Sequence, residues 1–160
     1  MLDQIAAVLG RTPSGLFIVT ARNAEGQETG LLASWVQQAA FDPPAVTVAV
    51  NRKRYIHTWL ADSPRLAFNL LGESQKNFLG HFGKGFEPGE PAFEGLHIDR
   101  TPTGLPVLSD ALGWMEGDVI GSLEAGDHII YLVQLTAAKA GSDLESHKPW
   151  VHIRKNGLGY

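Results

Sequence analysis

The sequence has 160 residues, of which 44% are hydrophobic and 19% charged, and its formal net charge is −4. This balance predicts one globular domain over residues 1–160 with a single core. The acidic charge argues against nucleic acid as a main partner, and the absence of cysteine excludes disulfides, thiolate catalysis and cysteine-bound metals. Apolar runs fall far short of the roughly 20 residues of a membrane span, so no membrane contact is expected. With no signal peptide recognisable, a cytoplasmic location is expected.

The first half of the chain predicts one short helix followed by strands. Residues 2–9 carry apolar side chains at helical spacing, and Gly10 is a suitable stop. Strands are expected at 15–22, 29–37 and 45–50, the first two joined by the turn composition of NAEGQ. The proline pair Pro43–Pro44 precedes the third strand; proline fixes φ and removes an amide donor, so this turn is expected to be stiff.

The second half alternates short helices with strands and contains one long loop. Helices are predicted within KRYIHTWLAD and ESQKNFLGHFGK, where apolar side chains share a face. Residues 83–106, rich in glycine and proline, are expected to hold little regular structure. Further strands are predicted at 65–71, 111–124, 127–139 and around 150–154. Many strands and few short helices predict a mainly β fold, a closed or partly closed antiparallel barrel.

Polar side chains gather in LLASWVQQAAFDPP, where a strand end meets the prolines. Ser34 offers a hydroxyl, and Gln37 and Gln38 offer amides. With the backbone, such groups can bond the edge of a planar polar ring. A polar strand end followed by an ordinary loop explains the same residues.

Cations precede a predicted helix in NRKRYIHTW. Arg52, Lys53 and Arg54 come first, and His57 and Thr58 fall in the first turns. Positive charge beside a helix start suits a phosphate. A solvated basic loop is the alternative.

Two histidines have neighbours that suit a ligand site. In EAGDHIIY the preceding carboxylate can orient His128. In FLGHFGKG, His81 and Phe82 can cover a flat ligand. An ordinary strand histidine and a core aromatic explain them equally well. No histidine spacing suits a metal, and no P-loop, GxSxG or GxGxxG occurs. A nicotinamide nucleotide would therefore bind transiently and without a Rossmann fold.

Taken in order, these motifs resemble the flavin reductase-like family of FMN-binding split β-barrels. The matching stretches are LGRTPSGLFIVTAR, LLASWVQQAAFDPPAVTVAV, NRKRYIHTWL, FNLLGESQKNFLGHFGKGF, PVLSDALGWMEGDV, GDHIIYLVQL and HIRKNGLGY. Within the family, LLASWVQQAAFDPP, HFGKGFEPGEPAFEGL and the tail are most similar to the C-terminal flavin reductase-like modules of diflavin flavoproteins.

The resemblance implies a non-covalent FMN, a homodimer, and electrons from NADH or NADPH. It places His128 on the nicotinamide side as the catalytic residue, with Tyr160 and His152 contributed by the closing segment. The implied cofactor-binding residues are Leu32, Ala33, Ser34, Trp35, Val36, Gln37 and Gln38 at the ring, Asn51, Lys53, Arg54, His57 and Thr58 at the phosphate, and His81 and Phe82 from the helix.

The sequence also departs from the family's pattern. Many family reductases have threonine in place of Leu32 and serine in place of Trp35 and Gln38, so hydroxyls are missing at the expected ring edge. The main hypothesis is an FMN-dependent reductase that passes electrons to free flavin or a partner protein. One alternative is an FMN-binding electron-transfer module without its own NAD(P)H turnover, serving a flavodiiron-type partner. Another is a barrel that has lost its cofactor.

Overall fold

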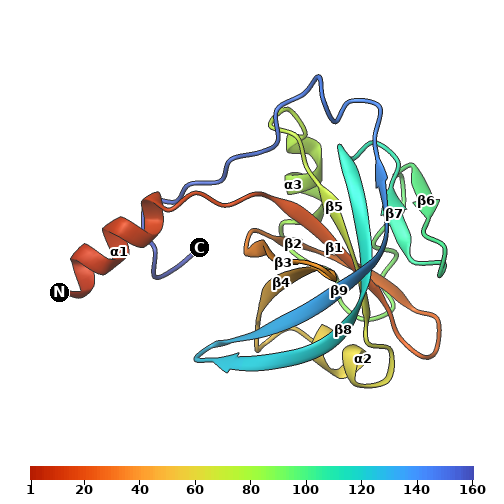
Figure 1. Cartoon of the computed structure of the whole chain (residues 1–160), viewed down its shortest axis with the longest axis horizontal. Coiled ribbons are helices and arrows are strands. Elements are labelled where there is room, and N and C mark those ends of the chain that lie inside the picture. The colour runs from red at the N-terminus through yellow and green to blue at the C-terminus, as the bar shows by residue number, and fades with distance from the viewer.

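The computed structural model describes residues 1–160, which form three helices and nine strands (Figure 1). The helices are α1 (Leu2–Arg11), α2 (Ile56–Asp62) and α3 (Lys76–Phe82). The strands are β1 (Phe17–Arg22), β2 (Glu28–Ala33), β3 (Val36–Phe41), β4 (Pro44–Asn51), β5 (Arg65–Leu70), β6 (Ile98–Arg100), β7 (Pro106–Leu108), β8 (Gly113–Ala125) and β9 (His128–Ala140). No helix is long and apolar enough to cross a membrane.

Seven strands form one antiparallel sheet in the order β2-β1-β5-β8-β9-β4-β3. Its two edge strands, β2 and β3, follow each other in the chain with only Ser34 and Trp35 between them. The sheet must therefore curl until its edges approach each other, which gives a barrel split along β2 and β3. This confirms the prediction of a mainly β, antiparallel fold with short helices.

The main core fills the inside of this barrel. Alternate side chains of the strands point inward, as the two-residue period requires. They include Val19, Val48, Phe68 and Val133, all without measurable exposure. Helix α2 closes one end, because Ile56, Trp59 and Leu60 pack into the same cluster.

The outer face of the sheet carries a second core beneath α3 and the 83–112 segment. Phe78 and Phe82 from α3 pack there against Ile18 and Leu108. Buried Asn69 ties the layers together: its Nδ2 donates to the Ile18 carbonyl at 2.9 Å, and its Oδ1 accepts from the Leu108 N–H at 2.7 Å. The long loop is thus a covering layer of the sheet.

Several predicted elements have different bounds in the structure. The single strand expected at 29–37 is wrong: pairing changes from β1 to β4 at Ser34–Trp35, so two strands form. The 83–106 loop does leave the sheet, but β6 within it pairs with β7. The strand expected around 150–154 is also wrong, because His152 makes only an isolated bridge to Ser14. Helix α1 runs one residue past Gly10.

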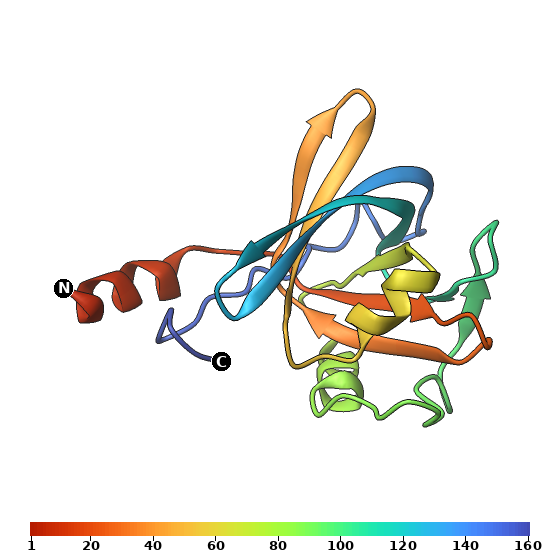
Figure 2. The same cartoon turned by 90° about the horizontal axis from the view of Figure 1, so that it is seen from below.

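The proline pair lies at the tip of the β3–β4 hairpin, which projects from the barrel in Figure 2. Phe41 pairs with Pro44 there, while Val36 pairs with Val48 nearer the hairpin's base. The prolines therefore shape the turn between the two strands, as predicted, but at the end of the hairpin away from Trp35 and Asn51.

Truncating a side chain in the core and truncating one at the hairpin tip should change the free energy of unfolding by different amounts. Phe68→Ala should lower the free energy of unfolding by about 3–5 kcal/mol, because it leaves a cavity in the barrel core. Phe41→Ala removes the same ring from a site that is 90% exposed and should change stability by less than about 0.5 kcal/mol. Urea unfolding of both variants checks this, and equal losses would contradict the described core.

Candidate functional site

The point where β2 gives way to β3 gathers several of the predicted site residues. Trp35 lies outside both strands, and its carbonyl accepts the Ala49 N–H at 3.1 Å. Across the sheet, Asn51 at the end of β4 lies opposite His128 at the start of β9. The Trp35 and His128 rings are 4.8 Å apart. We call the set Trp35, Asn51 and His128, with the turn 51–54, the split corner.

His128 is held in one orientation by its neighbours. Its Nδ1 lies 2.7 Å from the Asp127 carboxylate, which can only accept, so Nδ1 carries the proton. Nε2 lies 3.0 Å from the Tyr160 hydroxyl, which then donates to it. The hydrogen bond to His128 holds the pKa of the Asp127 carboxyl below its usual value, and the charge of Lys53 acts in the same direction. The orienting role expected for Asp127 thus has a geometric basis.

The turn after β4 presents two cations without ion pairs. Asn51 shapes this turn: its Oδ1 accepts the Lys53 N–H at 3.0 Å and its carbonyl accepts the Arg54 N–H at 3.0 Å. Arg52 is engaged by Glu124 and the Gly126 carbonyl. Lys53 and Arg54 form no salt bridge and are exposed. Their charge is therefore available to an anion.

His57 braces the turn from inside. Its Nε2 donates to the Asn51 carbonyl at 2.8 Å, because a carbonyl can only accept. The Tyr131 hydroxyl, 2.6 Å from Nδ1, then donates to the second nitrogen. Burial raises the pKa of Tyr131, which keeps that hydroxyl protonated. Both ring nitrogens of His57 are thus hydrogen-bonded within the protein, so His57 stabilises the turn.

The remaining predicted residues occupy several environments. Ala33 and Val36 are buried in the barrel core, and Leu32 and Phe82 pack in the outer core. Ser34 stands beside Trp35 at the strand break and is half-buried. The other members lie apart from the corner: Gln37 and Gln38 are exposed along β3, Thr58 caps its own turn through the Tyr55 carbonyl, and His81 donates to the Ala92 carbonyl at 2.7 Å. Their cofactor-binding roles stay predictions.

A small pocket opens beside the cation turn, between the turn, β2 and the start of the 83–112 segment. Tyr55 anchors its wall, since its hydroxyl lies 2.7 Å from both the Thr29 hydroxyl and the Phe86 carbonyl. The lining residues are Thr29, Gly30, Leu31, Arg54, Tyr55, Ile56, Gly85 and Phe86. Of the residues predicted to bind the phosphate, Arg54 is thus the one that lines this pocket.

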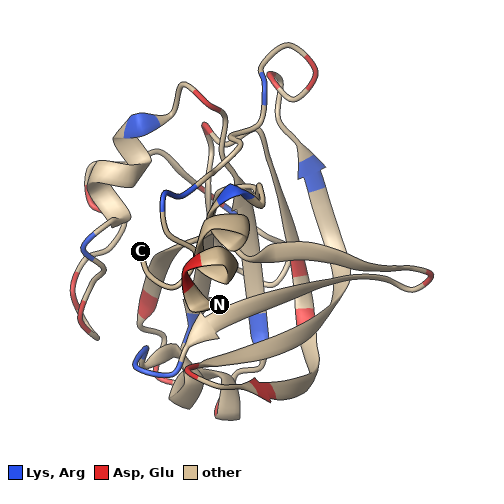
Figure 3. Ribbon diagram, turned by 90° about the vertical axis from the view of Figure 1, so that its left-hand side faces the viewer, with Lys and Arg blue, Asp and Glu red and all other residues tan.

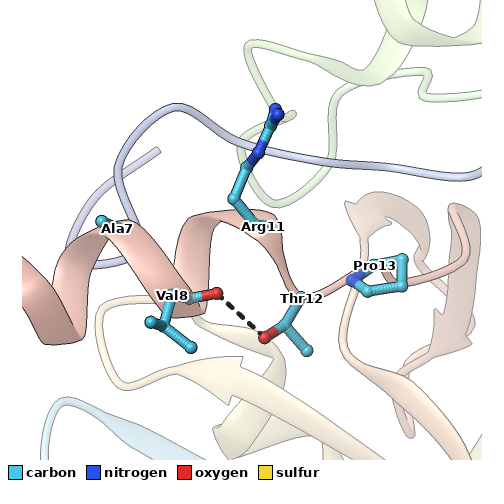
Figure 4. A pocket seen from close by; sticks show the side chains of 5 residues that line it. All are labelled: Ala7, Val8, Arg11, Thr12 and Pro13. Carbon is cyan, nitrogen blue, oxygen red and sulfur yellow. Dashed lines mark hydrogen bonds between the residues drawn. The ribbon is translucent and has the colours of Figure 1, made fainter.

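A shallow hollow elsewhere, at the C-terminal end of α1, has a different character (Figure 4). It is lined by Ala7, Val8, Arg11, Thr12 and Pro13. Its hydroxyl group is already used, because Thr12 donates to the Val8 carbonyl at 3.1 Å. With a single charged group and no cluster of polar partners, it offers little for a cofactor, and we place the candidate site at the split corner.

The closing segment supplies a residue that sequence reasoning missed. The Arg154 guanidinium lies over the Trp35 ring, 5.2 Å from its centroid. Tyr160, which the resemblance had placed here, sits 6.1 Å from the same ring. The pKa of the Tyr160 hydroxyl is raised, because desolvation of the hydroxyl outweighs the opposing charges of Arg154 and Arg54. No local pattern in the sequence indicates that this segment returns to the corner.

Comparison with known proteins agrees with this architecture. The family described as flavin reductase like domain matches residues 9–157. This chain belongs to that family. It is similar to diflavin flavoprotein A 1 of Synechocystis, 37% identical over 159 residues, which are 99% of this chain and 27% of the relative. Putative diflavin flavoprotein A 3 of Nostoc is 35% identical over 95% of this chain and 26% of its own length. The chain thus spans about a quarter of these relatives.

Solved structures show the same fold. The NADH:FAD oxidoreductase SgcE6 of Streptomyces globisporus superposes with a TM-score of 0.83 and 23% identity, covering 93% of this chain and 87% of that one. The styrene monooxygenase flavin reductase of Pseudomonas putida S12 gives a TM-score of 0.78 and 25% identity, covering 93% and 92%. The expected fold is therefore confirmed, and the match to the family model over residues 9–157 confirms the expected family.

The closing segment also contains a histidine whose protonation should be measurable. Burial, with a smaller contribution from the charge of Arg154, lowers the pKa of His152 from its usual value of 6.5. In an NMR titration its imidazole should therefore titrate below 6.5. Because the unfolded chain takes up this proton first, stability should fall as the pH drops below 6.5, and His152→Asn should fall less. A midpoint at or above 6.5 would contradict this.

Proposed function

We propose that this chain is a single FMN-binding domain that accepts electrons from NADH or NADPH, and that the split corner is its flavin site. The observation that supports this most directly is the meeting of a strand break, an oriented histidine and two unpaired cations at one place. When bound, the isoalloxazine of FMN supplies hydride acceptance and onward electron transfer. The protein's own residues hold, orient and enclose it.

The residues present suit the two ends of such a ligand. At the strand break, Ser34 and the neighbouring backbone lie outside both strands and can face a planar ring edge. Lys53 and Arg54 suit the dianionic phosphate, with Asn51 and His57 fixing the turn that carries them. Leu32 does not obstruct this place, because it packs in the outer core. The hydroxyls that this chain lacks relative to the family pattern belong to the ring edge, so their absence leaves the phosphate end unchanged.

His128 is the proposed catalytic residue on the nicotinamide side. Asp127 keeps its Nδ1 protonated, so Nε2 is the nitrogen turned toward the site. There it can accept a hydrogen bond from a carboxamide and fix the orientation of the nicotinamide. Such positioning brings reactants to near-attack distance without a protein nucleophile.

A second candidate function is electron transfer without NAD(P)H turnover. The relatives named diflavin flavoproteins favour it, because this chain matches only about a quarter of their length. In that case a flavodiiron-type partner protein would exchange electrons with the bound FMN. The cytoplasmic location expected from the sequence stays a prediction under either function.

We also propose a homodimer. Helix α1 extends away from the barrel in Figure 1, and its apolar side chains are left exposed. Leu2, Ile5, Val8 and Leu9 are exposed on it, and Val8 is 68% exposed. An apolar face of this kind is typical of a surface buried in an assembly.

The phosphate assignment predicts a difference between two flavins. Lys53→Ala and Arg54→Ala should each weaken FMN binding roughly 10-fold, because each removes a charge-assisted contact. Riboflavin has the same ring without the phosphate, so its binding should change by less than about twofold. Flavin fluorescence titration measures both. Lys139→Ala, at the far end of β9, is the matched control. Equal losses for the two flavins would contradict the assignment.

The two functions differ in the source of electrons. Under the reductase proposal, stopped-flow mixing of the FMN-loaded protein with NADH or NADPH without oxygen should bleach the flavin absorbance. His128→Ala should slow this step by roughly 10-fold or more, because the nicotinamide loses its orienting partner, while FMN affinity stays within about twofold. If neither nucleotide bleaches the flavin, the reductase proposal is refuted and electron transfer without NAD(P)H turnover becomes the proposed function.

A further inference from the structure

The last residues of the chain return across the split corner and end on its histidine. Tyr160 donates to His128 Nε2 at 3.0 Å, and Arg154 covers the Trp35 ring. In Figure 3 the C-terminal end lies beside α1, which points toward the viewer. The residues that would face a nicotinamide therefore already have partners within the chain.

The root of this tail is firmly attached to α1. The Arg154 N–H donates to the Gly10 carbonyl and the Gly157 N–H to the Ala6 carbonyl, both at 2.8 Å. The packing there is close, because a Cβ on Gly157 would come within 2.3 Å of the Leu9 Cβ. The chain up to Gly157 is thus held firmly against α1.

The tip beyond Gly157 is attached by much less. Leu158 and Tyr160 are exposed, Tyr160 to 88%. Besides the hydrogen bond to His128, the tip is held by the Arg154 Nη1 bond to the Gly159 carbonyl at 3.1 Å and a local turn between Asn156 and Leu158. Segments with few buried contacts and exposed hydrogen bonds open at small free-energy cost.

A ligand that needs His128 must compete with this tip. Asp127 occupies Nδ1, and while the Tyr160 hydroxyl occupies Nε2 the ring has no free nitrogen. We propose that residues 158–160 form a strap that covers His128 and Trp35, and that a nicotinamide nucleotide displaces it when it binds. This inference rests on the proposed function, whereas the covering of His128 is testable without it. The strap lowers the apparent nucleotide affinity by the fraction of time it is closed.

Chemical labelling tests the strap directly. Diethyl pyrocarbonate acylates accessible neutral imidazole, and mass spectrometry reports each histidine separately. Deleting residues 158–160 should raise the labelling rate of His128 severalfold, and Tyr160→Phe, which keeps the ring, should raise it roughly 2- to 10-fold by removing one hydrogen bond. Exposed His97 is the internal reference, and Lys155→Ala, in the same segment, is the control variant.

Each result of this experiment decides one claim. Unchanged labelling of His128 in the deletion variant, with His97 labelled equally in all proteins, overturns the strap. Stopped-flow measurement adds the functional side: the deletion should lower the nucleotide concentration needed for half-maximal flavin reduction, with FMN affinity unchanged, and a higher concentration overturns the proposed competition. Faster labelling together with no reduction by NADH or NADPH leaves the covering intact and refutes the reductase.

Discussion

The change of strand partner at Ser34–Trp35 is the constraint on which the site depends. β2 hydrogen-bonds to β1 and β3 hydrogen-bonds to β4, and these two strands are the opposite edges of a seven-stranded sheet. A two-residue connection can join opposite edges only if the sheet curls until they approach. The same closure leaves the joint itself outside the regular ladders, where backbone and side chains can meet a ligand. The closed fold and the strand break at Ser34–Trp35 therefore have one origin.

The register between β4 and β9 then assembles the other half of the site. Because Asn51 pairs with His128, the end of one strand places the cation turn beside the start of the other, which carries the histidine. His57 reinforces this arrangement by bonding Asn51 on one side and Tyr131 of β9 on the other. A shift of register by one residue would turn each of these side chains to the opposite face. The proposed phosphate and ring ends of the candidate site thus share one geometric support.

The sequence predicted those parts of the structure that local pattern determines. The strand-like composition of β1, the small and β-branched residues of β4 and the shared face of Ile56, Trp59 and Leu60 identify these strands and this helix correctly. β3 was not predicted as a separate strand, because QQAAF is mostly exposed and becomes a strand only by pairing with β4. The position of Arg154 over Trp35 depends on contacts between distant residues, which composition and periodicity do not contain. The motif order, however, was sufficient to indicate the family.

The two sides of the split corner differ in rigidity, and this difference suits two kinds of ligand. On the sheet side, the turn is fixed by hydrogen bonds from His57 and Asn51 and by the buried strands behind it. On the tail side, the exposed tip beyond Gly157 contributes only a few contacts. A preorganised surface reduces the ordering cost of binding and favours a ligand that stays. A weakly held cover suits one that enters and leaves in each turnover. Under the proposed function, this asymmetry favours a resident flavin phosphate on the sheet side and a transient nucleotide on the tail side.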